Sequence, residues 1–481
     1  MARHDPYGAL REANYRLFLS GFVCSSTGLQ MMAAAVLWEI YQRTNSALAV
    51  GLTGLVRALP VVLLALPAGH VVDSVDRKRV LMWTQLAMGS AALGLAVVSW
   101  SEAPLWVMYA MLLLTGCARS FNGPVRSALL PQLVDRAHFQ NAVTWNGSVF
   151  QFSAICGPIL AGAMMGWLGL AWPVYVVTAA GCLLLAFNAA ALQPRAVEST
   201  APKGVSLSGM LAGLGHLWRE KAIFGALSLD LFAVLLGGAT ALLPVYASEI
   251  LHVGEFEYGV LKASPYVGAL VMALFLAHNP IRRAAGKAML WSVAGFGVSI
   301  IVFGLSSNFW LSLAALALGG AADMVSVVIR HVLVQHRTPE NLRGRVAGVN
   351  SVFIECSNEL GAFESGLVAK FFGPVFSAVS GGVGTVLVVL GIAWLVPELR
   401  KLDRLDEAED GGSGPGGAGP GGAGSDGAGP GGPGAGATAG GSGAAGAGPG
   451  ATGEWGPAGP GGVAVGGGVA GGGAVGGGAT C

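Results

Sequence analysis

The stretch Gly69-His-Val-Val-Asp73-Ser-Val-Asp76-Arg77-Lys78-Arg79 joins two long apolar segments, residues 47–72 and 80–100. It places two carboxylates and three cations in a very short link. Apolar segments of this length are long enough to cross a lipid bilayer. We therefore expect a tight charged hairpin at a membrane surface.

The composition supports a membrane protein. Charged residues make up 11% of the chain and hydrophobic residues 53%, whereas about 25% of residues are charged in soluble domains. The mean hydropathy is +0.63. The formal net charge of +1 gives no reason to expect a nucleic-acid partner. The six cysteines are scattered without a C-x-x-C pair, so neither a disulfide framework nor a metal site is predicted.

Twelve membrane spans are predicted when about 20 apolar residues are required for each. This makes the fold class all-α integral membrane. The first six spans cover residues 17–41, 47–72, 80–100, 105–120, 141–168 and 172–192. The second six cover residues 222–247, 257–276, 289–305, 309–329, 346–372 and 374–396.

Lysine and arginine indicate the orientation. They concentrate in the loops on the side of both chain ends, while the opposite loops hold little beyond Arg43 and Lys370. Positive charge favours the cytoplasmic side of a membrane. We expect a multi-pass protein of the cytoplasmic, or inner, membrane with both termini in the cytoplasm.

An internal repeat divides the chain. Residues 133–150, which lead into the fifth span, are similar to residues 339–353, which lead into the eleventh. Two six-helix halves in tandem are predicted, as parallel repeats. The domains are then the N-terminal half (1–192), a cytoplasmic linker (193–221), the C-terminal half (222–400) and a Gly/Ala/Pro-rich tail (401–481). The composition of the tail predicts disorder.

These features resemble the major facilitator superfamily of transporters. The link has its G-x-x-x-D-x-x-x-[RK]-[RK] loop pattern, with Ser74 and Asp76 as departures from the usual residues. Segments 44–51, 129–134 and 358–366 are similar to the efflux branch that includes the bacterial enterobactin exporter. The resemblance implies a gating loop whose residues are Gly69, Asp73, Arg77, Lys78 and Arg79.

Within this resemblance, Asp73 is expected to pair with the start of the eleventh span near Arg345, while Arg77, Lys78 and Arg79 hold the loop at the anionic membrane surface. The corresponding loop of the second half, residues 278–287, has no aspartate. The latch is therefore predicted to be one-sided.

Ionisable residues inside the spans are the candidate functional residues, because a charge in hydrocarbon is costly and normally faces a cavity or a partner. They are Glu39, Arg57, Asp230, Lys262, Asp323, Arg330, Glu355, Glu359 and Glu364. The third, sixth, ninth and twelfth spans contain none. In the major facilitator fold these four spans lie outermost, towards lipid.

Glu355 and Glu359 are four residues apart and share one helix face. Two such carboxylates in a low dielectric do not ionise together readily, so we expect one to hold a proton. Asp230 is a second candidate for proton coupling, and Arg57 could balance a carboxylate or attract an anion. The alternative is static ion pairing with Arg57, Lys262 or Arg330.

Two further pairings stay open at this stage. Asp323 and Arg330 share a helix face and form a candidate gate pair, or they anchor a helix end. Arg119 and Gly123 have the R-x-x-x-G spacing of a motif in proton-driven exporters. However, a fourth span ending at residue 120 places Arg119 at its inner end, whereas the motif of the family lies deeper.

Proton-coupled export of a small siderophore-like or drug-like molecule by alternating access is the function favoured by the resemblance. The alternatives are a proton-coupled importer of a small nutrient and a non-transporting membrane protein. The eight histidines lie in loops or at span ends and no Walker loop is present, so an enzyme is not expected. We expect no cofactor or metal, a monomer, and as partners a small-molecule substrate, protons and the lipid bilayer.

Overall fold

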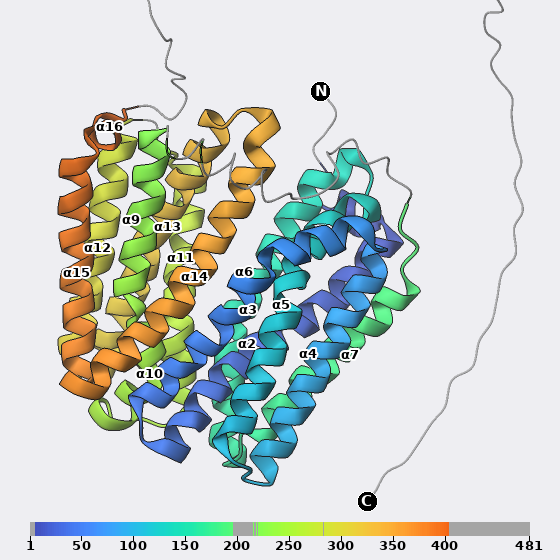
Figure 1. The fold of residues 1–481 in the computed structure, drawn as a ribbon, viewed down its shortest axis with the longest axis horizontal. Helices are drawn as coiled ribbons and strands as arrows, with labels where there is room; N and C mark the ends of the chain where they lie inside the picture. Colours follow the sequence, from blue (N-terminus) through green and yellow to red (C-terminus); the bar gives the residue numbers. More distant parts are fainter. Residues whose placement is uncertain (1–4, 196–214, 216–217, 219, 282, 404–481) are drawn as a thin grey trace, which may run out of the picture. The chain divides into compact units, whose positions relative to one another are not determined.

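The computed structural model describes residues 5–195, 215, 218, 220–281 and 283–403. The predicted tail and most of the predicted linker, 193–221, lie outside these residues. Helices account for almost all regular structure in the described part, which confirms the all-α class (Figure 1). Residues 1–412 cluster as one unit by their contacts, so the predicted domain boundaries at residues 192 and 222 stay a prediction.

The N-terminal group of helices contains the first six predicted spans. Its elements are α1 (Gly8–Arg11), α2 (Ala13–Thr44), α3 (Ala47–Ser74), α4 (Arg77–Trp100), α5 (Leu105–Leu133), η1 (Arg136–His138), α6 (Phe139–Leu168) and α7 (Trp172–Ala191).

The C-terminal group contains the other six. Its elements are α9 (Lys221–Leu236), η2 (Gly238–Leu242), α10 (Leu243–Val245), η3 (Tyr246–Ile250), α11 (Glu255–His278), α12 (Ala285–Leu305), α13 (Phe309–Arg337), α14 (Glu340–Phe372), α15 (Pro374–Leu395) and α16 (Pro397–Lys401).

Local capping residues fix where several helices begin and end. The Asp76 carboxylate accepts a hydrogen bond of 3.0 Å from the Lys78 amide, so α4 starts directly after the short link from α3. The Asn308 side chain does the same for the Leu311 amide at the start of α13. Gly169 ends α6 in the left-handed region, with a φ of 66°, which glycine adopts without strain.

Ten helical stretches in the described residues are long and apolar enough to cross a membrane. Helices α5 and α14, of 29 and 33 residues, are not among the ten and carry several of the charged residues considered below. The total of twelve spans is consistent with these elements and remains a prediction.

The helix of the predicted fourth span extends well beyond residue 120, because α5 ends at Leu133. The polar residue Asn122 does not end the helix, since it accepts a hydrogen bond of 3.1 Å from the side chain of Gln85 on α4. Pro124 and Pro131 are likewise accommodated within α5.

The predicted seventh span, 222–247, lies within a single apolar stretch, Lys221–Ile250, that is long enough to cross a membrane. Its helix is not regular throughout, because α9 ends at Leu236 and is followed by 3-10, short α-helical and π-helical turns. The break begins at two glycines. A Cβ atom on Gly238 would lie 2.4 Å from the carbonyl oxygen of Gly361 on α14, and one on Gly237 would lie 2.7 Å from the Phe296 ring. Close approach of the neighbouring helices therefore coincides with the break.

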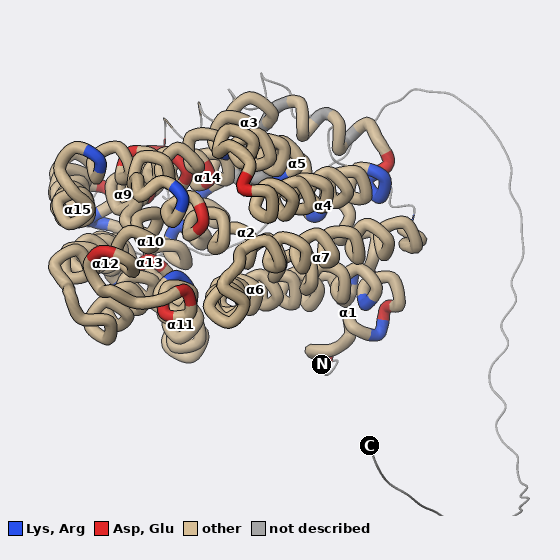
Figure 2. The backbone as a smooth tube through the Cα atoms, turned by 90° about the horizontal axis from the view of Figure 1, so that it is seen from below, with Lys and Arg blue, Asp and Glu red and all other residues tan. Residues whose placement is uncertain are grey.

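The two groups meet along two helix pairs. Within each group the helices pack mainly on one another, while α3 packs against α14 and α6 against α11 (Figure 2). Glycines allow the first crossing: a Cβ on Gly51 would lie 2.9 Å from the Cα of Gly366. Small residues permit such close helix contacts in membranes.

Among the described residues, apolar packing joins the groups at one end. One cluster contains residues of both groups, including Trp38, Tyr41 and Tyr258, and lies at the end opposite α1 and α16 (Figure 1). At the end that carries α1 and α16, each group has an apolar cluster of its own. We call these the closed end and the terminal end.

Candidate functional site

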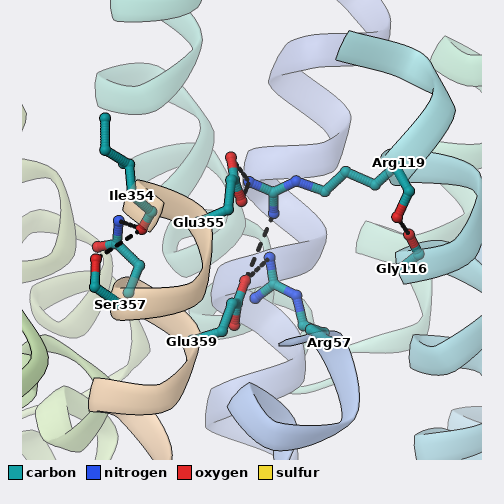
Figure 3. A network of polar contacts seen from close by, with 9 residues as sticks. Arg57, Gly116, Arg119, Ile354, Glu355, Ser357 and Glu359 are labelled. Atoms are coloured by element: carbon teal, nitrogen blue, oxygen red, sulfur yellow. Dashed lines mark hydrogen bonds and ion pairs between the residues drawn. The ribbon is translucent and has the colours of Figure 1, made fainter. Parts of the chain in front are cut away.

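Four charged side chains form a cluster between the two groups, near the middle of their helices (Figure 3). Arg57 of α3 lies 3.1 Å from Glu359 of α14, measured from Nη2 to Oε1. The Nη2 of Arg119 on α5 donates to both carboxylate oxygens of Glu355, at 3.0 and 2.8 Å. Its Nη1 lies 3.7 Å from Glu359 Oε1. We call these four residues the central ion cluster.

Close helix crossings bring the cluster together. A Cβ on Gly54 would lie 2.3 Å from the carbonyl oxygen of Glu359, so α3 and α14 almost touch at this level. Arg57 lies one turn further along α3 and reaches the Glu359 carboxylate. On the other side of α3, a Cβ on Gly116 would lie 3.0 Å from Pro60 Cγ, which brings α5 close enough for Arg119 to contribute.

The two halves of the cluster differ in their access to solvent. The side chains of Arg119 and Glu355 are 41% and 40% exposed, whereas that of Glu359 is only 11% exposed. The Arg119–Glu355 pair can therefore be reached from outside the protein, although Arg119 lies near the middle of its helix. Glu359 is held deeper, between two arginines.

Other ionisable groups surround the cluster. Lys262 of α11 interacts electrostatically with Arg57 and Glu359. Tyr266, on the same helix, interacts with both arginines of the cluster and with Glu355 and Asp323. These contacts extend the set of charges across α3, α5, α11, α13 and α14. A change in the protonation of any of these side chains therefore affects charged residues of both helix groups.

The reason given for a shared proton on Glu355 and Glu359 does not hold in this structure. The expectation rested on repulsion between two carboxylates on one helix face. The structure gives each carboxylate an arginine, and both arginines come from the other helix group. The pairing of Glu359 with Arg57 is the alternative that the sequence interpretation left open. The pairing of Glu355 with Arg119 was not predicted.

Arg119 was placed at the inner end of its span, because the fourth span was predicted to end at residue 120. In the structure Arg119 lies near the middle of the 29-residue helix α5 and no longer at its inner end. This position agrees with its R-x-x-x-G spacing with Gly123, since that motif is expected deep within a span.

Asp230 and Arg330 lie elsewhere, inside the C-terminal group. Arg330 of α13 forms an ion pair with Asp230 of α9, and their side chains are 3% and 8% exposed. The candidate gate pair of Asp323 and Arg330 is not formed among the described residues, because Arg330 turns towards α9. Asp323 remains on α13 within electrostatic reach of Tyr266.

The predicted gating loop is a short link, since α3 ends at Ser74 and α4 begins at Arg77. Lys78 does not point only towards a membrane surface: its ammonium donates a 2.7 Å hydrogen bond to the Leu192 carbonyl at the end of α7. Arg79 lies 3.8 Å from Asp76. Gly69 lies in the last turns of α3. The side chains of Asp73 and Arg345 lie outside the described part, so their predicted pairing stays a prediction.

The closed end has polar contacts between the groups. The Tyr41 hydroxyl on α2 donates to the Glu249 carboxylate in η3. The Trp38 and Tyr258 rings contact one another with centroids 5.0 Å apart and an angle of 30° between their planes, and the Tyr258 hydroxyl donates to the Ala34 carbonyl at 3.0 Å. These contacts join α2 to the C-terminal group.

Glu39, another predicted intramembrane charge, is satisfied within the N-terminal group. It forms an ion pair with Arg43 and accepts a 2.6 Å hydrogen bond from Tyr175. A hollow of about 690 Å³ lies beside it at the closed end. Since both oxygens of Glu39 are engaged, this carboxylate serves the structure of α2 and α7.

Glu12, Asp135 and His138 bring three potential metal-binding atoms within 4.8 Å of one another. However, the guanidinium of Arg195 pairs with both carboxylates, at 3.1 Å from Glu12. A cation therefore already occupies the position that a metal ion would take. This group is a structural tie at the terminal end of the N-terminal helices.

A family model described as transmembrane secretion effector matches residues 4–411. The chain belongs to this family. The chain is 28% identical over 396 residues to the enterobactin exporter EntS of Citrobacter koseri, a match that covers 82% of this chain and 94% of that protein. It is 26% identical over 397 residues to EntS of Salmonella typhimurium, with 82% and 95% covered.

Solved structures share the fold at low sequence identity. The nucleoside transporter NupG matches with a TM-score of 0.62 and 16% identity over 80% of this chain and 99% of its own. A bacterial homologue of the iron transporter ferroportin matches with a TM-score of 0.61 and 18% identity over the same shares. The major facilitator resemblance is confirmed: the chain is a multi-pass membrane transporter and not an enzyme.

Proposed function

We propose that this transporter exports a siderophore-like small molecule across the cytoplasmic membrane by alternating access, driven by protons. The relatives named as enterobactin exporters support the class of cargo and the direction. The distribution of lysine and arginine supports an orientation with both termini, and hence the terminal end, in the cytoplasm. The protein acts as a monomer in this proposal.

The central ion cluster carries the proposal of proton coupling. Its arginines belong to one helix group and its glutamates to the other, so each ion pair is also a link between the groups. A proton on Glu355 or Glu359 removes the negative charge and weakens that link, since the attraction requires both charges. Rocking of one group against the other is the general basis of alternating access.

The order of events follows from the state of the cluster. With the carboxylates ionised and paired, the closed end is shut and the terminal end is the side from which cargo binds. After the transporter turns outward, protons from outside neutralise the glutamates and cargo leaves. When the transporter returns, the protons leave to the cytoplasm, because Arg57 and Arg119 of the central ion cluster favour the ionised carboxylates. The gating loop from Gly69 to Arg79, with Asp73 near the start of α14, closes the terminal end in the outward state.

The first prediction tests the coupling. In inverted membrane vesicles with an imposed proton gradient, the wild type should accumulate enterobactin. Glu359→Gln should abolish this uphill accumulation while downhill flux persists, since the amide keeps the shape of the side chain but takes up no proton. Glu364→Gln on the same helix is the matched control and should transport normally, because Glu364 has no arginine partner among the described residues.

Two outcomes would contradict the proposal. If Glu359→Gln and Glu355→Gln both accumulate cargo at the wild-type rate, the central ion cluster does not couple protons to transport. If the vesicles accumulate no siderophore or drug-like compound while whole cells take up a nutrient through this protein, import replaces export.

A further inference from the structure

Arg126 is a cation that has no counter-charge among the described residues. It lies on α5, two turns beyond Arg119 towards the terminal end, and its guanidinium carbon is 4.6 Å from the centre of the Phe22 ring on α2. In the part of the chain that the structure describes, no carboxylate lies within 4.0 Å of it. Its Nε is buried and has no hydrogen-bond partner.

This position is unusual for an arginine within a membrane protein. A charge at membrane depth normally has a partner or faces a polar pathway. The face of Phe22 offers a cation–π contact, which offsets only part of the loss of hydration. The other charge recorded near Arg126 is Arg119, which repels it. The guanidinium is therefore available to bind an anion that does not belong to the described part of the protein.

Open space connects the two arginines. Arg119, Gly123 and Arg126 are spaced by four and three residues, so they lie on one face of α5. A Cβ on Gly123 would meet no other atom within 4 Å, and the side chain of Arg119 is 41% exposed. A ligand that contacts Arg126 can thus move along the same helix face to Arg119.

We propose that Arg126 and Arg119 are two successive binding positions for an organic anion, a carboxylate or an ionised phenol, and that this anion is the ionised group of the cargo. The proposal rests on the export function above. The anion enters at the terminal end, binds first to Arg126, and then competes with Glu355 for Arg119. The planar guanidinium of Arg119 suits this exchange, since it can bind the anionic group of the cargo in place of the Glu355 carboxylate.

The proposal explains why the accessible pair of the cluster is Arg119–Glu355. Glu355 is 40% exposed and can leave Arg119 for water when the cargo arrives, whereas Glu359 is held by Arg57 as well. Cargo binding therefore replaces one link between the helix groups with a cargo–arginine contact on the N-terminal group. The cargo itself loosens the cluster.

Binding of salicylate and salicylamide to the purified full-length protein in lipid nanodiscs tests this inference. The two probes have nearly the same shape, and only salicylate carries a charge at neutral pH. Titration followed by saturation-transfer NMR should show salicylate binding at least about tenfold more tightly than salicylamide, because a guanidinium prefers a carboxylate. Arg126→Gln should remove this preference, and Arg126→Lys should keep part of it.

Arg136→Gln is the matched control, since it removes the same charge from an exposed position at the same end of the N-terminal group. It should bind both probes as the wild type does. Thermal unfolding shows whether each variant is folded. If Arg126→Gln does not fold, Arg126→Lys still tests the preference for salicylate.

Equal binding of the two probes, no binding of salicylate, or an unchanged preference in Arg126→Gln would each overturn the anion positions. The experiment requires neither a proton gradient nor transport. Intact salicylate binding together with a failure to export in vesicles would therefore contradict the proposed function and leave the anion positions standing.

Discussion

Asp230 and Arg330 show how burial decides the role of a charged residue. Their pair is the most deeply buried ion pair of the described residues, with side chains 8% and 3% exposed. Removing one partner from such a pair leaves a bare charge in a low dielectric, which is far more costly than losing a surface pair.

Asp230→Asn should therefore destabilise the protein by about 3–5 kcal/mol. Thermal and denaturant unfolding in detergent would measure this loss. The double variant Asp230→Leu with Arg330→Met should recover most of the stability, because neither charge is then buried. Glu398→Gln, which affects the exposed Lys221–Glu398 pair, should leave unfolding unchanged. A wild-type melting temperature for Asp230→Asn would show that Arg330 finds another partner.

The sequence predicted which residues are charged within the spans and left their pairing open between alternatives. Arg330 was matched with Asp323 because both lie on one helix face, and it was also among the possible static partners of Asp230. The structure forms the second pair, with Asp230 coming from α9. Spacing along one helix does not decide between partners on different helices. Arg119 was placed at the inner end of its span, and Arg126 beyond it, since the fourth span was predicted to end at residue 120.

At the scale of helices, the crossing of α3 and α14 controls the central ion cluster. Gly54 allows the two helices to touch beside Glu359, and any side chain at this position would meet backbone. The spacing between Arg57 and Glu359 therefore depends on a residue that takes no part in the chemistry.

Gly54→Ala should push α3 away from α14 and weaken the Arg57–Glu359 contact. Its new Cβ would lie 2.3 Å from a backbone oxygen, and such overpacking costs about 1–3 kcal/mol. We expect a lower melting temperature and slower proton-driven export in vesicles. Gly391→Ala on α15 is the control, because its Cβ would meet nothing within 4 Å. Equal behaviour of the two variants would show that the crossing tolerates the shift.

Most helix positions followed from apolar length, and the exceptions depend on neighbours that are distant in the sequence. The seventh span was predicted as one helix because its glycines stand in an apolar run. Only the approach of Gly361 on α14 and of Phe296 on α12 shows that Gly237 and Gly238 lie at a break. Partners from distant parts of the chain are not visible in a local pattern.

At the scale of the whole molecule, the sequence predicted the fold but not which end of the transporter is closed. The apolar spans, the repeat and the loop pattern indicated a major facilitator transporter, and the comparisons confirm it. Which end is closed depends on contacts such as Tyr41 with Glu249. A transporter sequence must be compatible with at least two conformations, so it does not specify which one is observed.

Cross-linking at the closed end should stop the transport cycle. In a cysteine-free background, Tyr41→Cys combined with Glu249→Cys should react with a short bifunctional thiosulfonate reagent. Export in vesicles should then fall by at least about tenfold, because alternating access requires this end to open, and a reducing agent should restore it. The pair Asp135→Cys with Arg195→Cys, within one helix group, should cross-link without loss of export. Full activity of the cross-linked first pair would show that the closed end does not open.

The tie of Arg195 to Glu12 has a consequence for how the protein is made. These residues are 183 positions apart and join the first turns of the N-terminal group to the chain just after α7. During synthesis, Arg195 is translated before any residue of α9. Domains generally fold as units, with the N-terminal one first. The N-terminal group can therefore complete its own contacts while the ribosome is still at work, and later serve as the surface on which α14 and α11 assemble.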